Sequence, residues 1–229
     1  MRVIVTRARG DAARTAAALR ARGHEPLLSP VLEIVATGAA VDPGQAQAVI
    51  ATSAHAFEFL PQADAARLAP LPLFVVGART ARAAAEAGFA PPPVIAASAL
   101  ELAQQMAKAL PARARLLYLA GHDRKPDLEA ALGAQGHVID VVETYEARAV
   151  EALAPDVATA LIRGEADAVL HFSRRSAQLF AACVAKAGLS AQAQGLRHVC
   201  ISRDAALGAG ALIAPTPDSA GLFKALEQM

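Results

Sequence analysis

The segment VIVTRARGDAARTAAALRARGHE at 3–25 is matched in outline by LLYLAGHDRKPDLEAALGAQGHV at 116–138, at an offset of 113 residues. In both copies a short apolar run precedes a helix pattern that ends at a Gly-His pair. Further matches pair 49–60 with 169–180, 74–88 with 199–211, and 94–98 with 212–216, in the same order in both halves. Repeated blocks in a constant order indicate an internal duplication. The sequence therefore predicts two related domains.

Short, wholly apolar runs alternate with amphipathic helix patterns along the chain. The predicted strands are 2–6, 25–35, 48–52, 73–76, 93–96, 115–119, 137–145, 167–172, 197–201 and 211–214. Such strands are typical of parallel sheets that helices cover on both faces. We expect an α/β fold of βαβ units, with ten strands in two sheets of five. Strands 25–35 and 137–145 run into the linker-like segments 36–47 and 146–155, so we expect both to cross between the domains.

The composition excludes several function classes. The net charge is +1 without a basic stripe, which argues against a nucleic-acid partner. No apolar run approaches the roughly 18 residues that span a membrane. The apolar part of MRVIVTRARGD is too short for a signal peptide, so a cytoplasmic protein is expected. Cys183 and Cys200 are expected to be buried thiols, and no dinucleotide, P-loop or metal-ligand motif is present.

Cations and small polar residues follow the predicted strands where helices begin. They include Arg7, Ser53, Gly77, Thr80, Gly121, Ser173, Arg174 and Ser202. Ligands of open parallel sheets bind beyond the carboxyl ends of strands, where free N–H groups and helix dipoles favour anions. This pattern predicts a small polyanionic ligand. Each of these residues taken alone is better explained as a helix cap or a solvated side chain, and only the set as a whole favours the polyanion.

Of the two tyrosines, Tyr118 lies inside a predicted buried strand and is expected in the core. Tyr145 ends strand 137–145 at the predicted junction of the domains. A phenol there can face a cleft between the domains and donate its proton to a leaving oxygen. A tyrosine that only packs at the hinge would leave the same pattern, so both interpretations stay open.

Short motifs spread from residue 3 to about 226 resemble one protein family, that of uroporphyrinogen-III synthase. They are Val5-Thr6-Arg7, Ala51-Thr52-Ser53-Ala54, Val76-Gly77 with Thr80-Ala81, Leu117-Tyr118-Leu119 with Gly121, Val142 with Tyr145, Phe172-Ser173, and Pro215-Thr216. The resemblance implies two flavodoxin-like domains joined by a two-stranded crossover. One domain combines 1–35 with 149–229 and the other is 40–142.

The resemblance also implies a reaction. The substrate is hydroxymethylbilane, a linear tetrapyrrole with eight carboxylates, which loses water and closes with inversion of its last pyrrole ring. No cofactor and no metal are implied, and a monomer is expected. Tyr145 matches the family's tyrosine that assists departure of the hydroxyl. Thr6, Ser53, Gly77, Thr80, Ser173 and Ser202 stand where the family's carboxylate contacts lie.

Two other functions fit the same pattern. A two-domain binding protein for a small polyanion has a similar hinge, although receptors of this type are exported. A catalytically silent homologue that acts as a regulatory module is the second. The isomer of the product formed from hydroxymethylbilane distinguishes all three.

Overall fold

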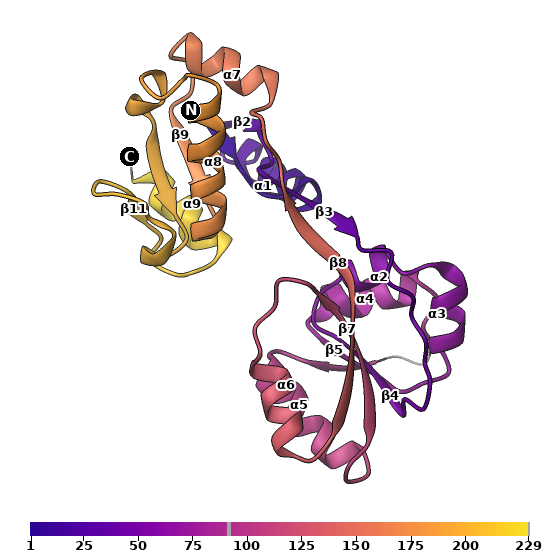
Figure 1. The fold of residues 1–229 in the computed structure, drawn as a ribbon. Coiled ribbons are helices and arrows are strands. Elements are labelled where there is room, and N and C mark those ends of the chain that lie inside the picture. The colour runs from indigo at the N-terminus through magenta and orange to yellow at the C-terminus, as the bar shows by residue number, and fades with distance from the viewer. Residues whose placement is uncertain (91–92, 229) are drawn as a thin grey trace. The chain divides into compact units, whose positions relative to one another are not determined.

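The computed structural model describes residues 1–90 and 93–228. The chain divides into two compact units (Figure 1). Unit 1 comprises Met1–Glu33 and Arg148–Met229, and unit 2 is Ile34–Ala147. That these units correspond to the predicted domains, 1–35 with 149–229 and 40–142, stays a prediction.

Unit 1 is built on a five-stranded sheet in the order β11-β10-β9-β1-β2, in which paired strands run parallel. Its strands are β1 (Arg2–Val5), β2 (Glu25–Leu28), β9 (Ala168–His171), β10 (Arg197–Cys200) and β11 (Leu212–Ile213). Val3, Ile4 and Val5 of β1 are fully buried. A run of apolar residues without alternation suits β1 to a central position, because helices cover it on both sides.

Helices cover both faces of the unit 1 sheet. They are α1 (Arg9–Arg20), α7 (Pro155–Ile162), α8 (Arg174–Lys186) and α9 (Ser219–Glu227), with short turns η1 (Gln192–Gly195) and η2 (Arg203–Ala205). Val3 packs with Leu19 of α1 and Leu222 of α9 on one face. Ile4 packs with Phe180 of α8 on the other. Alternate residues of β1 thus face α1 and α9 on one side of the sheet, and α7 and α8 on the other.

Unit 2 contains a six-stranded sheet in the order β3-β8-β7-β4-β5-β6. Its strands are β3 (Leu32–Ala36), β4 (Ala48–Ala51), β5 (Leu73–Val76), β6 (Val94–Ala96), β7 (Arg115–Gly121) and β8 (Val138–Ala149). The chain enters this unit through β3 and leaves it through β8. Val150 N donates to Val31 O at 3.0 Å and Thr37 N to Thr144 O at 3.2 Å, so this pair runs antiparallel. The other paired strands are parallel.

Helices also sandwich the unit 2 sheet, with α5 and α6 side by side on one face (Figure 1). The helices are α2 (His55–Glu58), α3 (Gln62–Leu68), α4 (Ala78–Glu86), α5 (Ala99–Ala109) and α6 (Asp127–Ala134). Phe57 of α2 and Leu68 of α3 pack with Leu119 of β7 on one face. Met106 of α5 packs with Tyr118 of β7 on the other. The sheet therefore separates two apolar cores.

The predicted α/β class with parallel sheets is confirmed, but details of the strands are wrong. The single strand 25–35 is two strands, β2 and β3, in different sheets. Ser29 N and Val31 N still donate to the β1 side, whereas Pro30 between them has no N–H to give. Unit 2 has six strands instead of five because β3 joins its sheet. β8 continues to Ala149, beyond the predicted end at 145.

Candidate active site

Unit 2 gathers polar residues at one edge of its sheet. β7, β4 and β5 are adjacent and parallel, so their carboxyl ends lie at the same edge. Thr52 follows β4, Gly77 follows β5, and Gly121 ends β7. Tyr145 lies on β8 opposite Gly121. The structure thus brings Tyr145 to the ligand-binding edge that the strand order defines.

The Tyr145 phenol borders a pocket of about 250 Å³. The pocket is lined by Thr52, Ala99, Tyr118, Gly121, Asp123, Arg124, Lys125, Asp127, Leu128 and Tyr145. The Tyr145 ring is partly buried, packs against the core under α2 and α4, and lies 5.6 Å from the His55 ring between centroids. Within the described residues its hydroxyl has no hydrogen-bond partner. This hydroxyl can therefore donate to a molecule in the pocket.

Tyr118 is buried, as the sequence predicted, but it also lines the pocket. Its hydroxyl is 2.8 Å from Thr52 Oγ1, so the two hydroxyls share a hydrogen bond. Burial raises the pKa of the Tyr118 phenol, and the hydrogen bond with Thr52 opposes that rise. The Tyr118 hydroxyl is thus already paired, in contrast to that of Tyr145.

Arg124 is fixed at the pocket by two carboxylates. Its Nη1 donates to Glu143 Oε1 at 2.7 Å and its Nε to Glu129 Oε1 at 2.7 Å. Glu143 also bonds His122 Nδ1 at 2.8 Å. The hydrogen bonds from His122 and Arg124 lower the pKa of the Glu143 carboxyl, and the bond to Glu143 raises the pKa of His122. The carboxylates of Glu129 and Glu143 therefore balance much of the Arg124 charge.

Lys125 differs from Arg124 in this respect. It lines the same pocket and is exposed. Among the described residues it makes no ion pair. Lys125 is therefore the pocket cation best able to attract an incoming carboxylate.

The other predicted residues of unit 2 lie around the same edge in different roles. Ser53 Oγ accepts from His55 N at 3.4 Å. Gly77 precedes α4 with a φ of 81°, in the left-handed region that favours glycine. Thr80 lies in the first turn of α4 and is buried. The backbone N–H of Ser53 can reach a ligand, whereas that of Gly77 already donates to Ala96 O at 2.9 Å. The Thr80 side chain is buried and does not face solvent.

Unit 1 has its own set at the carboxyl ends of β1, β9 and β10. Thr6 is fully buried and donates to Leu170 O at 2.8 Å, so its hydroxyl ties β1 to β9. The Arg7 guanidinium pairs with Asp11 at 2.9 Å and lies 4.3 Å from the centre of the Phe172 ring. Ser202 lies before η2, at the carboxyl end of β10.

The remaining two unit 1 residues open α8. Ser173 caps the helix by accepting from Ser176 N at 3.1 Å. Arg174 is exposed and lies 3.7 Å from Asp204. The structure thus groups the unit 1 residues at one sheet edge, but their side chains mostly have partners already.

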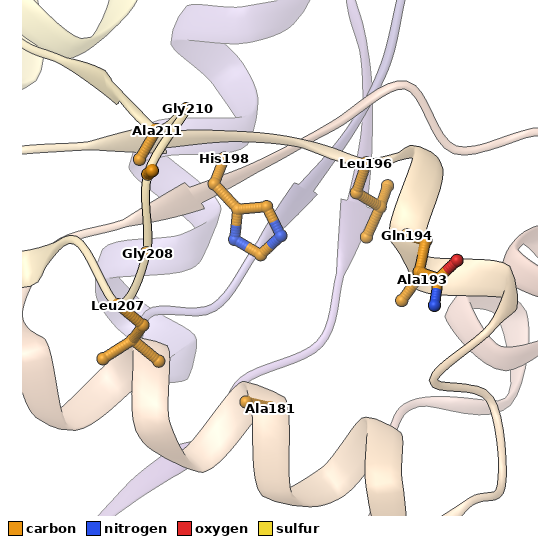
Figure 2. Close-up of a pocket in the computed structure, with 10 residues that line it drawn as sticks. Ala181, Ala193, Gln194, Leu196, His198, Leu207, Gly208, Gly210 and Ala211 are labelled. Carbon is orange, nitrogen blue, oxygen red and sulfur yellow. The ribbon is translucent and has the colours of Figure 1, made fainter.

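A pocket of about 400 Å³ in unit 1 lies away from these residues (Figure 2). His198 and Gln194 supply its polar side chains, and small or apolar residues such as Leu207 line most of the rest. The His198 ring stacks on His171, with Nδ1 and Nε2 3.0 Å apart. Burial lowers the pKa of His171 to about 3. None of the site residues predicted from the sequence lines this pocket.

Sequence reasoning missed part of the pocket around Tyr145. Thr52 stood inside a recognised motif, and Lys125 stood beyond a strand end, but neither was selected. Glu143, which holds Arg124, was missed because its partners His122 and Arg124 lie about 20 residues earlier, in the loop between β7 and α6. The available hint was the polar run from Glu143 to Glu146 at the end of a largely apolar predicted strand.

No helix within the described residues has the length and apolar character needed to cross a membrane. The same residues contain no group of three or more His, Cys, Asp or Glu side chains arranged to hold a metal ion.

Comparisons with known proteins point in one direction. A sequence model of a protein family described as uroporphyrinogen-III synthase HemD matches residues 13–224. Among curated proteins there is no significant match. Uroporphyrinogen-III synthetase from Helicobacter pylori is 17% identical with a TM-score of 0.68, over 100% of both chains. A mutant uroporphyrinogen III synthase from Thermus thermophilus is 19% identical with a TM-score of 0.52, again over 100% of both. At these identities the structures show likeness of fold.

Proposed function

Because the chain belongs to the uroporphyrinogen-III synthase family, we propose that Tyr145 is the proton donor of its reaction. The protein is a cyclising lyase of tetrapyrrole biosynthesis. It converts hydroxymethylbilane to uroporphyrinogen III, with loss of water and inversion of the terminal pyrrole ring.

The chemistry requires little covalent assistance. The terminal hydroxyl leaves as water once it receives a proton, and the electron-rich pyrrole supplies the electrons that break the C–O bond. The last pyrrole ring of the linear tetrapyrrole then attacks the carbon that lost the hydroxyl, which gives a spiro intermediate. This intermediate rearranges so that the last ring is inverted. Because the unaided substrate closes without inversion, the protein must mainly hold both ends in one geometry.

One observation carries the assignment of the donor. The Tyr145 hydroxyl borders the pocket at the carboxyl edge of the unit 2 sheet and has no partner in the described part of the chain. A positioned phenol with a free O–H can protonate a leaving oxygen. Lys125 lines the same pocket and can bind a substrate carboxylate beside the reacting group.

We assign carboxylate contacts to residues of both units. In unit 2 they are Ser53, Gly77, Thr80, Gly121 and, as an addition, Lys125; in unit 1 they are Thr6, Arg7, Ser173, Arg174 and Ser202. Thr6 and Thr80 are buried, so their contribution is through the backbone. Arg7 and Arg174 each face an acidic partner, which a substrate carboxylate must join or displace. That the two sets bind one substrate, with Tyr145 facing a cleft between domains, stays a prediction.

We further propose that both units are flavodoxin-like domains. The strands of a flavodoxin-like sheet lie in the order 2-1-3-4-5. Numbered along the chain, the unit 1 strands follow this order from β2 to β11. In unit 2, β7 corresponds to strand 1, β8 to strand 2, and β4, β5 and β6 to strands 3, 4 and 5, so the order β8-β7-β4-β5-β6 is again 2-1-3-4-5. β3 is an additional strand at the edge beside β8. The duplication supports this, since it pairs the β1 segment with the β7 segment. A monomer that works in the cytoplasm without cofactor or metal completes the proposal.

The test is to incubate the protein with hydroxymethylbilane, generated by the enzyme that synthesises it, and to separate the isomers of the product. Uroporphyrinogen III formed in excess of the spontaneous I isomer is the expected result. Only the I isomer, formed at the rate of a reaction without protein, would overturn the proposal. Tight substrate binding together with that outcome would indicate a binding protein or a silent homologue.

A further inference from the structure

β8 changes the face to which its side chains point just before Tyr145. Ile139 and Val141 pack against the core under α5 and α6, and Val142 packs against the opposite core. In a regular strand, Tyr145 would face away from Val142, because neighbouring side chains alternate. Tyr145 instead packs against the same core as Val142.

An extra residue explains the change. Ala120 of β7 pairs with Glu143 and the next residue, Gly121, pairs with Tyr145, so Thr144 has no partner on β7. This is a β-bulge, which shifts the alternation by one and re-aims the side chains beyond it. The bulge therefore turns the Tyr145 phenol toward α2 and α4.

Backbone hydrogen bonds hold the bulge from both sides. Thr37 N donates to Thr144 O at 3.2 Å, and His122 N donates to Tyr145 O at 2.9 Å. Thr144 itself is buried. The backbone of Tyr145 is thus fixed, so the position of its ring depends on the residues that the ring contacts.

One of these residues is Gly121, which lies directly beside the Tyr145 ring. A Cβ added to Gly121 would lie 2.7 Å from Cε2, 2.7 Å from Cζ and 2.8 Å from the hydroxyl oxygen of Tyr145. Unbonded carbons normally approach to about 3.5–4.0 Å. The φ of Gly121 is outside the left-handed region, so space and not backbone conformation requires glycine here.

We propose that Gly121, together with the bulge at Thr144, positions the Tyr145 hydroxyl for proton donation. Gly121 is a positioning residue that acts through Tyr145, in addition to the carboxylate contact proposed for it above. The inference rests on the proposed role of Tyr145. Any side chain at 121 must push the phenol by about 1 Å, and misplacement on that scale costs about 10²-fold in rate.

The test compares Gly121→Ala with Gly133→Ala. Gly133 lies in α6, and a Cβ there meets no atom within 4 Å. We expect kcat to fall by about 10²-fold in Gly121→Ala, with KM within about twofold, and no fall in Gly133→Ala. Gly121→Ala should add no further loss in a Tyr145→Phe background, because the group that it misplaces is already gone.

The outcomes separate this inference from the proposed function. Wild-type kcat in Tyr145→Phe would overturn the donor assignment itself. A slow Tyr145→Phe with an unaffected Gly121→Ala would overturn only the positioning role. An equal fall caused by Gly121→Ala in both backgrounds would show that Gly121 acts independently of the phenol, which also overturns it.

Two further measurements do not depend on activity. The chain has two tyrosines, so 3-fluorotyrosine labelling gives two ¹⁹F resonances, which Tyr118→Phe assigns. Gly121→Ala should shift the Tyr145 resonance and Gly133→Ala should not; an unmoved resonance overturns the inference. If Gly121→Ala is unstable, adding Tyr145→Ala should restore its Tm by removing the clash. Failure to restore it would place the clash elsewhere and refute the positioning role.

Discussion

Tyr145→Phe and Tyr118→Phe make a matched pair, because each removes one hydroxyl and keeps the ring. The Tyr145 hydroxyl has no partner in the described part of the chain, so its loss should leave stability nearly unchanged. The Tyr118 hydroxyl is 2.8 Å from Thr52 Oγ1 and the residue is 3% exposed. Losing that bond should cost about 0.5–1.5 kcal/mol, toward the lower value because water in the pocket can reach Thr52. A Tm shift of roughly 2–8 °C per kcal/mol follows.

The rates should show the opposite pattern. A positioned general acid contributes about 10²–10⁴-fold, so kcat of Tyr145→Phe should fall by that factor with KM nearly unchanged. The fall should lie at the lower end, since this hydroxyl leaves readily and water can substitute for the phenol. Tyr118→Phe should retain kcat.

The assay follows uroporphyrinogen III at early times, before spontaneous closure accumulates, and thermal unfolding is measured on the same preparations. A Tyr145→Phe protein that runs at the wild-type rate, beside a slow Tyr118→Phe protein, would refute the assignment of the acid.

Three other predictions concern charge. Lys125→Gln should raise KM about two- to tenfold with kcat little changed, since it removes one cation–carboxylate contact. Lys108→Gln, at an exposed position of α5, should have no effect, and equal KM values in the two variants would count against Lys125. KM should rise with added salt, which screens exposed charges over about 10 Å at 0.1 M, and Arg7→Ala or Arg174→Ala should weaken binding more than folding; a salt-independent KM contradicts the polyanion model. The native pKa of His171, about 3, lies below its unfolded value of about 6.5, so stability should be lost as pH falls from 6.5 toward 3, by at most about 5 kcal/mol. His171→Leu cannot take up this proton and should flatten the dependence of Tm on pH; identical slopes would disprove the effect.

The strand ends were predictable because their signal is local. A short apolar run followed by Thr6-Arg7 or Ser173-Arg174 marks a strand that ends where a helix begins, and the parallel order then brings such ends together. The division of 25–35 between two sheets was not predictable, because each half is a good strand by composition. The first half pairs with β1 and the second half with β8, and these long-range pairings are not visible in the local sequence.

The environment of Tyr145 lay further beyond the sequence. A bulge depends on the count of residues between hydrogen bonds on two strands, and nothing in Glu143-Thr144-Tyr145 marks the extra one. The close contact with Gly121 follows from that register. Likewise, Arg124 and Lys125 are neighbours of equal formal charge in the sequence, and only tertiary contacts show that two carboxylates already hold Arg124.

β1, an interior strand of the unit 1 sheet, has a bearing on synthesis at the ribosome. β1 pairs with β9, where Val3 lies opposite Ala168, and the whole of Ile34–Ala147 is translated between them. At about 5–20 residues per second, roughly 10–30 s pass before β1 meets that partner. During this interval the inserted unit can complete its sheet, while Val3, Ile4 and Val5 wait with only β2 and α1 for cover. The nascent chain thus leaves an apolar strand without its second partner throughout this interval, which makes this stage the natural point for chaperone binding and for aggregation.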